Sequence, residues 1–200
     1  MTCLAPSVSR ALVASLAAAV ALSGCITLGK PPKASYLPDY SVFESTVRPS
    51  GGPTVYLQDA TAAPGYDTYA MVERSTGAEI VERNATEWKM KPAELVTRKF
   101  FEHVLASGKF SYPRSSTLEA EMRLHPIVRR FDEMHEGAVW SAVFAVDIEI
   151  MGKDGQAVTY LRLPEVKELA ATADPQGVAA AMARAMHTGL DQAVAAAAAR

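Results

Sequence analysis

Four histidines are the side chains of this 200-residue chain best suited to acid–base or metal chemistry, and they stand at positions 103, 125, 135 and 187. Two histidines that share a metal ion on one helix usually lie four residues apart, so that both rings face the ion. No pair among the four has this spacing. We therefore predict no metal site and no cofactor, and we place His103 on the polar side of a helix without a role.

The densest polar stretch is FDEMHEG, in which Asp132 to Glu136 precede Gly137. Its carboxylates and imidazole could be imagined as the ligands of a metal-binding loop. A solvated connection between two strands is the simpler interpretation, because charged side chains are mostly exposed. We favour the solvated connection.

Motifs that activate a nucleophile or hold a phosphate are missing from the sequence. There is no Gly-x-Ser-x-Gly elbow and no glycine-rich phosphate loop. The formal net charge is -2 and no basic block stands out, so the electrostatic signature of a nucleic-acid-binding protein is also missing. We predict a protein that is not an enzyme and does not bind nucleic acid.

The first 25 residues have the layout of a secretory leader. Arg10 precedes an apolar run over residues 11–22, which is shorter than the about 20 residues of a membrane-spanning helix. The run ends in LSGC, residues 22–25, which has the order leucine, small residue, glycine, cysteine of a bacterial lipobox. An ordinary signal peptide and a short membrane anchor are the alternatives. We predict that residues 1–24 are removed and that the thiol of Cys25 is acylated.

Acylation of Cys25 would attach the mature chain to a membrane, and the residues around it bear on how stable the attachment is and which membrane is used. Cys3 lies in the removed segment, so no thiol pair remains for a disulfide. Two or more acyl chains anchor a protein stably, whereas one gives marginal binding. Ile26 follows the cysteine, and in similar lipoproteins an aspartate there favours the inner membrane. In a Gram-negative host we therefore expect a lipid anchor on the periplasmic face of the outer membrane, with the inner membrane less favoured.

The rest of the chain separates into a tether and one folded domain. Residues 25–53 are rich in proline, glycine and serine and have no sustained period, so we predict a tether. Residues 54–200 are expected to fold. Strand patterns cover residues 54–59, 66–74, 78–83, 119–125, 139–150 and 156–163, with turns at residues 75–77 and 154–155.

Two helices complete the expected domain. The first begins at Pro92 and ends at Gly108, and the second begins at Asp174 and Pro175 and continues almost to the end of the chain. Their apolar stripes are Val96, Phe100 and Val104 in the first helix, and Val178, Met182, Met186, Leu190 and Val194 in the second. The order of strands, helix, strands and helix predicts an α+β fold. We expect a two-layer sandwich, an antiparallel or mixed sheet with both helices on one face.

Pro126 interrupts the strand pattern that begins at residue 119, which favours an edge strand or a bulge. Edge strands and the loops beside them are where another chain can add by backbone pairing. We therefore predict that a partner protein contacts this region. The predicted contact residues are Arg123, Arg129, Arg130, Phe131 and Asp132.

Several of these segments have the order and spacing found in a known family. The shared positions are Tyr66 and Asp67 opening a strand, Trp88 ahead of Pro92, Ser107, Gly108 and Phe110 at the end of the helix, and Phe131 and Asp132 in a later strand. Over residues 54–198 the chain resembles the ABC-type transport auxiliary lipoprotein family, which includes the lipoprotein of the paraquat-inducible Pqi system. One departure is the long segment after Cys25, in which SYLPDYSVF is the nearest candidate for the family's short tyrosine-rich strand.

The resemblance implies a non-catalytic auxiliary component of an ABC- or MCE-type transport system that moves lipids between the two membranes. The implied partners are an MCE-type periplasmic protein, ABC transporter components, or both, and an oligomer is compatible with this role. The alternative is a periplasmic lipoprotein that binds a lipid or another hydrophobic cargo itself. An adaptor needs an exposed apolar patch or sheet edge, whereas a carrier needs a pocket of some hundreds of cubic ångströms.

Overall fold

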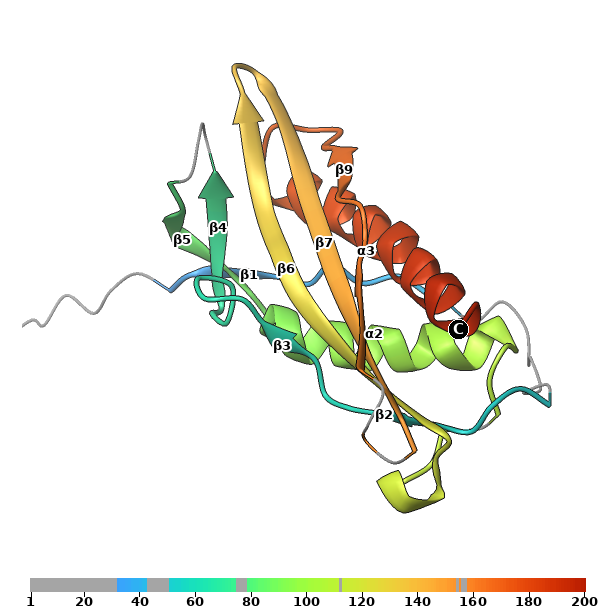
Figure 1. The fold of residues 1–200 in the computed structure, drawn as a ribbon. Helices are drawn as coiled ribbons and strands as arrows, with labels where there is room; N and C mark the ends of the chain where they lie inside the picture. Colours follow the sequence, from blue (N-terminus) through green and yellow to red (C-terminus); the bar gives the residue numbers. More distant parts are fainter. Residues whose placement is uncertain (1–31, 43–50, 75–78, 112, 154, 156–157) are drawn as a thin grey trace, which may run out of the picture. The chain divides into compact units, whose positions relative to one another are not determined.

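The computed structural model describes residues 32–42, 51–74, 79–111, 113–153, 155 and 158–200. The chain divides into two units, Met1–Pro32 and Lys33–Arg200, and every element described below belongs to the second unit. This unit has the predicted α+β fold, a mixed sheet of up to nine strands with two helices packed on it (Figure 1).

The sheet is built around a long hairpin. Its strands are β1 (Ala34–Tyr36), β2 (Val55–Leu57), β3 (Thr61–Ala62), β4 (Ala70–Arg74), β5 (Val81–Trp88), β6 (Met122–Glu136), β7 (Val139–Gly152), β8 (Val158–Arg162) and β9 (Val166–Leu169). The hydrogen-bonded order is β1-β5-β4-β6-β7-β8, while β2 and β3 also pair with β6, and β9 pairs with β7. Strands β6 and β7 are antiparallel and turn at Gly137, whose φ of 64° suits glycine.

Both predicted helices begin and end where their capping residues indicate. Helix α2 (Pro92–Ser107) starts with proline in its first turn and ends at Gly108, which has a left-handed φ of 61°. Helix α3 (Pro175–Ala198) is capped by Asp174, whose carboxylate accepts a 2.7 Å hydrogen bond from the Gly177 amide. A short 3₁₀ helix, η2 (Thr117–Glu119), precedes β6.

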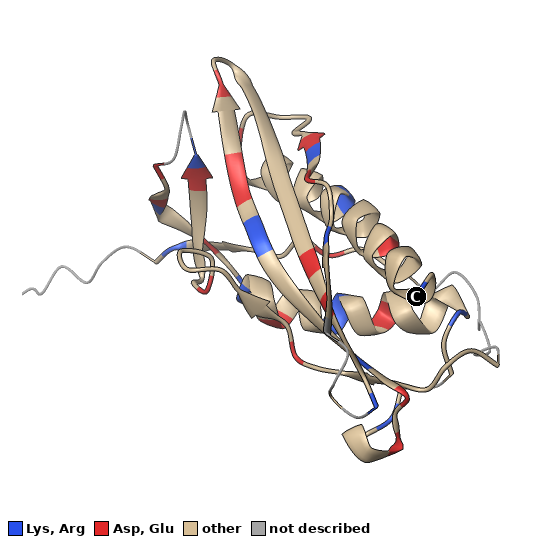
Figure 2. Ribbon diagram, in the orientation of Figure 1, with Lys and Arg blue, Asp and Glu red and all other residues tan. Residues whose placement is uncertain are grey.

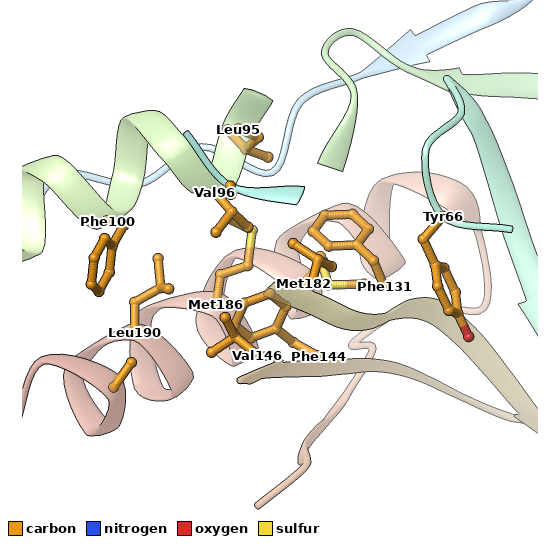
Figure 3. Close-up of a cluster of buried hydrophobic side chains, with 14 of the residues drawn as sticks. Tyr66, Leu95, Val96, Phe100, Phe131, Phe144, Val146, Met182, Met186 and Leu190 are labelled. Atoms are coloured by element: carbon orange, nitrogen blue, oxygen red, sulfur yellow. The ribbon is translucent and has the colours of Figure 1, made fainter. Parts of the chain in front are cut away.

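The apolar stripes of the two helices are buried against one face of β6 and β7 (Figure 3). On the sheet side, the rings of Phe131 and Phe144 meet edge to face with centroids 6.1 Å apart. On the helix side, Gly189 of α3 lets the helix approach Phe144 closely. The buried stripe positions are Val96, Phe100 and Val104 in α2, and Val178, Met182, Met186, Leu190 and Val194 in α3.

The predicted strands are found with changed bounds. The strand expected at residues 119–125 begins at Met122 and continues through Pro126 to Glu136. Strands β7 and β8, which stand before and after the turn predicted at residues 154–155, pair in antiparallel orientation. The turns predicted at residues 75–77 and at Asp154 lie outside the described residues. Strands β1, β3 and β9 had no strong sequence pattern, because they are short and only partly buried.

Of the two expectations for the strand around Pro126, the edge strand is wrong, whereas a bulge-like register shift is found just beyond it, between Val128 and Arg130. Strand β6 pairs with β7 on one side and with β2, β3 and β4 on the other. The carbonyls of Leu124 and Val128 accept hydrogen bonds from the β2–β3 side, and backbone alternation directs Pro126 to the same side. There the chain leaves the sheet between β2 and β3, and the Ala60 amide bonds to Thr97 Oγ1 instead. A proline is tolerated inside β6 because its missing N–H faces this gap.

Candidate functional site

The predicted acylation site Cys25 and the predicted sorting residue Ile26 lie outside the described residues, so both stay predictions. The chain is described from Pro32 onward, and there part of the predicted tether packs on the domain. Strand β1 pairs in parallel with β5, and the Lys89 amide donates a 2.8 Å hydrogen bond to the Tyr36 carbonyl. The folded unit therefore begins at Lys33, earlier than the predicted boundary at residue 54.

Tyr40 fixes the end of this N-terminal segment to α2. Lys99 is buried, and its ammonium group donates a 2.5 Å hydrogen bond to the Tyr40 carbonyl. The same ammonium group lies 2.8 Å from Asp39 and 3.0 Å from Glu102. The hydrogen bond from Lys99 holds the pKa of Asp39 below its usual value. We call Asp39, Tyr40, Lys99, His103 and Asp191 the junction cluster, because they join this N-terminal segment to both helices.

His103 is not on the polar side of α2, as the sequence suggested, but buried between the helices. Its Nδ1 lies 2.7 Å from Asp191 of α3, and its Nε2 lies 3.0 Å from the Tyr40 hydroxyl. Burial lowers the pKa of His103 and raises the pKa of Tyr40. An acid, an imidazole and a hydroxyl thus form a chain, but the raised pKa keeps the phenol protonated. The arrangement suits a structural contact that holds the N-terminal segment to α2 and α3, rather than a nucleophile.

The predicted contact residues Arg129, Arg130 and Asp132 come together on the sheet face opposite the helices. Alternation puts Arg130 and Asp132 there, because Phe131 points into the helix-covered core, and the register shift of β6 between Val128 and Arg130 brings Arg129 to the same face. Figure 2 shows the charged positions along β6 and β7. We call the group the arginine cluster; it consists of Arg74, Arg129, Arg130, Asp132, Asp147 and Glu165.

The arginine cluster pairs three guanidinium groups with three carboxylates. Arg130 binds Asp132 through two hydrogen bonds of 3.0 and 2.7 Å. Arg129 lies 3.2 Å from both oxygens of Asp147. Both arginines also reach Glu165, at 3.0 and 2.7 Å. Adjacent residues share this partner because the pairing register of β6 shifts between Val128 and Arg130, as at a β-bulge.

The burial of Asp132 indicates that this cluster stabilises the fold. The side chain of Asp132 is 0% exposed, and besides Arg130 it contacts Arg74 at 3.3 Å and the Tyr66 hydroxyl at 3.3 Å. Hydrogen bonding to Asp132 raises the pKa of Arg130, and hydrogen bonding to Tyr66 raises the pKa of Arg74. The charges are compensated within the domain.

The edge-strand basis for a partner contact at these residues is therefore wrong. Strand β6 is internal, Phe131 and Asp132 are buried, and Arg129 and Arg130 are engaged with carboxylates of the same chain. Arg123 is half-buried, with its guanidinium 5.9 Å from the Tyr56 ring centroid. A contact through backbone pairing needs a different strand.

A largely apolar groove of about 460 Å³ lies beside α2, where the chain leaves β2. Phe101 is on its wall with 38% of its surface exposed, and Leu105 is half-buried there. The lining residues are Leu57, Gln58, Asp59, Thr97, Arg98, Phe100, Phe101, Glu102 and Leu105. Phe101 and Leu105 directly follow Phe100 and Val104 of the buried stripe in the sequence, and their place at the groove explains their partial exposure.

The stretch from Asp132 to Glu136 is not a solvated connection. It is the end of β6, in which Asp132 and Glu133 are buried, and the turn begins only at Gly137. Glu133 and His135 lie beside Glu73 of β4, with ligand-type atoms of all three within 4.8 Å of one another. Spacing along one segment could not reveal this group, because Glu73 comes from a strand 60 residues earlier in the sequence.

Within the part of the chain that the structure describes, no helix combines the length and the apolar character needed to cross a bilayer.

Comparison with known proteins gives likenesses of fold. No protein-family profile matches the sequence, and no curated protein matches it. The structure is similar to that of a Xanthomonas campestris protein of family DUF330, with a TM-score of 0.69 and 20% identity, over 80% of this chain and 92% of that one. An uncharacterized protein has a TM-score of 0.61 at 12% identity, over 84% of this chain and 97% of that one. Chlamydia trachomatis protein CT253 has a TM-score of 0.52 at 7% identity, over 75% of this chain and 100% of that one. At these identities the likeness shows a shared fold.

Proposed function

We propose that this chain is a non-catalytic lipoprotein, anchored through Cys25 to the periplasmic face of the outer membrane, that serves as an auxiliary component of an ABC- or MCE-type transport system. The observation that carries the proposal is the LSGC sequence at the end of the leader, followed by one folded α+β unit. The resemblance to the ABC-type transport auxiliary lipoproteins supplies the transport system, and lipids are the cargo class that it suggests.

The junction cluster supports an anchored adaptor. In this proposal the segment that contains Tyr40 connects the anchor at Cys25 to the domain. Here the Tyr40 carbonyl and hydroxyl are both bonded, to Lys99 of α2 and to His103 between the helices. The segment from the anchor is thus tied to the same two helices that cover the sheet.

The sheet edge at β8 supplies a surface for a protein partner. The hydrogen-bonded order of described strands ends at β8, so one side of this strand is open to a further strand. Tyr160 is 54% exposed on β8, and Arg162 at its end is exposed as well. We propose that a strand of the transport protein pairs with β8, which keeps the backbone-pairing mechanism and moves it from β6 to the edge of the sheet.

The groove beside α2 favours a second function, in which the lipoprotein binds a lipid or another hydrophobic molecule itself. Its volume of about 460 Å³ is in the range of small-molecule sites. Phe100, Phe101 and Leu105 would contact an acyl chain, and Arg98 at the rim would face a polar group.

Purification of the lipidated protein from detergent-solubilised membranes, followed by mass spectrometry, tests the proposal. We expect an MCE-type protein or an ABC permease to be recovered with the native chain. The Cys25→Ser variant should lose the label of a palmitate analogue and recover less of the partner. Equal labelling of the variant would refute the anchor, and recovery of lipid without any transport protein would favour the second function.

A further inference from the structure

The end of the β6–β7 hairpin holds a group of ligand-type side chains that the proposed function does not use. Glu73 of β4 stands opposite Glu133 of β6 in the parallel register, and His135 lies two residues further along β6, on the same face. The His135 ring stacks on Trp140 of β7 with centroids 4.0 Å apart. We call Glu73, Glu133 and His135 the Glu–His cluster.

The contact with Glu73 indicates which nitrogen of the His135 ring carries the proton. Nδ1 of His135 lies 2.9 Å from a Glu73 oxygen, which is a hydrogen-bond distance. With its proton on Nδ1, a neutral imidazole has its lone pair on Nε2. Nε2 in turn lies 3.5 Å from Glu133 Oε2. Two electron-rich atoms therefore face each other across a short gap.

These two atoms are buried, and neither makes a hydrogen bond among the described residues. The side chain of Glu133 is 1% exposed, and its charge is met by the guanidinium of Arg83, which contacts the other oxygen. Buried polar atoms without hydrogen bonds are rare in folded proteins, and an ion between them is one explanation.

The spacing fits a metal ion better than a direct hydrogen bond. Two ligands that stand about 2.0–2.2 Å from a tetrahedral Zn²⁺ are about 3.3–3.5 Å from each other. The separation of 3.5 Å between Nε2 and Oε2 matches this value and is long for a hydrogen bond. An imidazole nitrogen with carboxylate oxygens is also a ligand set that Zn²⁺ accepts.

We propose that the Glu–His cluster binds a divalent transition-metal ion, Zn²⁺ in the first place, between His135 Nε2 and Glu133 Oε2. Glu73 orients the ring through Nδ1, as carboxylates behind metal-bound histidines do. Water would fill the remaining coordination positions. The ion would tie β4 to the end of the β6–β7 hairpin.

Isothermal titration calorimetry with Zn²⁺ tests the proposal. The sample is the lipidated protein in detergent, carrying no polyhistidine tag and freed of metal by chelation. We expect one ion per chain, and a thermal midpoint raised by at least about 3 °C in excess Zn²⁺. His135→Gln and Glu133→Gln should each weaken binding at least about tenfold, and Glu73→Ala should weaken it by about 10–100-fold.

The chain provides a matched control in His125→Gln. His125 also contacts a glutamate, since its Nδ1 lies 3.1 Å from Glu149, but its Nε2 is engaged by Thr61 at 3.2 Å and no ligand atom is left over. This variant should bind Zn²⁺ with unchanged affinity. The metal-free midpoint of each variant separates loss of fold from loss of site, and Glu73→Ala leaves both proposed ligand atoms in place. Absence of saturable binding to the native chain, or equal affinity in His135→Gln and His125→Gln, would overturn the proposal.

Discussion

Replacing Arg130 with alanine should destabilise the domain far more than a surface substitution does. Arg130 donates two hydrogen bonds to Asp132 and one to Glu165, and Asp132 is fully buried. The variant leaves this carboxylate with Arg74 and Tyr66 as its remaining partners. The arginine cluster then has one carboxylate more than it has guanidinium groups.

The expected loss is about 3 kcal/mol of unfolding free energy. Removing one partner of a buried ion pair costs about 3–5 kcal/mol, and the remaining contact with Arg74 places Arg130→Ala at the low end of that range. In a domain of the size of Lys33–Arg200, each kcal/mol lowers the midpoint of thermal unfolding by about 2–4 °C. The midpoint should therefore fall by about 6–12 °C.

Thermal and urea unfolding followed by circular dichroism measure this loss, with Arg98→Ala as the control. Arg98 also pairs with a carboxylate, Glu102, but its side chain is 53% exposed, so we expect a change of about 0.5 kcal/mol or less. A double-mutant cycle with Asp132→Asn should give a coupling energy of about 1.5–3 kcal/mol between Arg130 and Asp132. Midpoints of the Arg130 and Arg98 variants within about 1 °C of each other would refute the structural role of the cluster.

Two further predictions concern the helices. Gly189→Ala should lower the free energy of unfolding, measured in urea, by about 1–2 kcal/mol. The new Cβ would lie 2.7 Å from Phe144 Cδ1, and the cost of this overpacking exceeds the gain in helix propensity. A more stable variant would contradict the close packing of Gly189 on Phe144. In the folded chain, burial lowers the pKa of His103 below its usual 6.5, despite the contact with Asp191. As the pH falls, the unfolded chain therefore takes up a proton on His103 before the folded chain does. The free energy of unfolding should decrease as the pH drops below about 6.5. His103→Gln should reduce this slope between pH 7 and 5, and an unchanged slope would show that other groups cause it.

The local patterns of the sequence predict the helices well. Pro92 and Gly108 act through backbone preferences, and Asp174 acts through a side-chain cap to a nearby amide, so none of them needs tertiary context. The apolar stripe of each helix determines which side is buried. Strand β7 is found for the same reason, because its apolar residues alternate with polar ones.

The candidate sites depend on pairings between distant segments, which is why the sequence alone did not show them. Pro126 indicated an edge, but the gap between β2 and β3 accommodates it inside the sheet. The polarity of His103 indicated exposure, but Tyr40 and Asp191 bind it from elements 63 and 88 residues away. Glu133 looked solvated because Arg83 is 50 residues away in the sequence. In each case a charge or a proline is compensated by a partner that only the fold provides.

Site-specific photocrosslinking in cells tests the central claim, a lipid-anchored adaptor that docks through its sheet edge. A photoreactive residue at Arg162 on β8 samples the proposed docking edge, and one at Phe101 samples the groove beside α2. We expect position 162 to form an adduct with an MCE-type protein or an ABC transporter component, and Cys25→Ser to weaken this adduct. A lipid adduct at position 101 with no protein adduct at position 162 would contradict the adaptor and favour direct binding of a hydrophobic cargo.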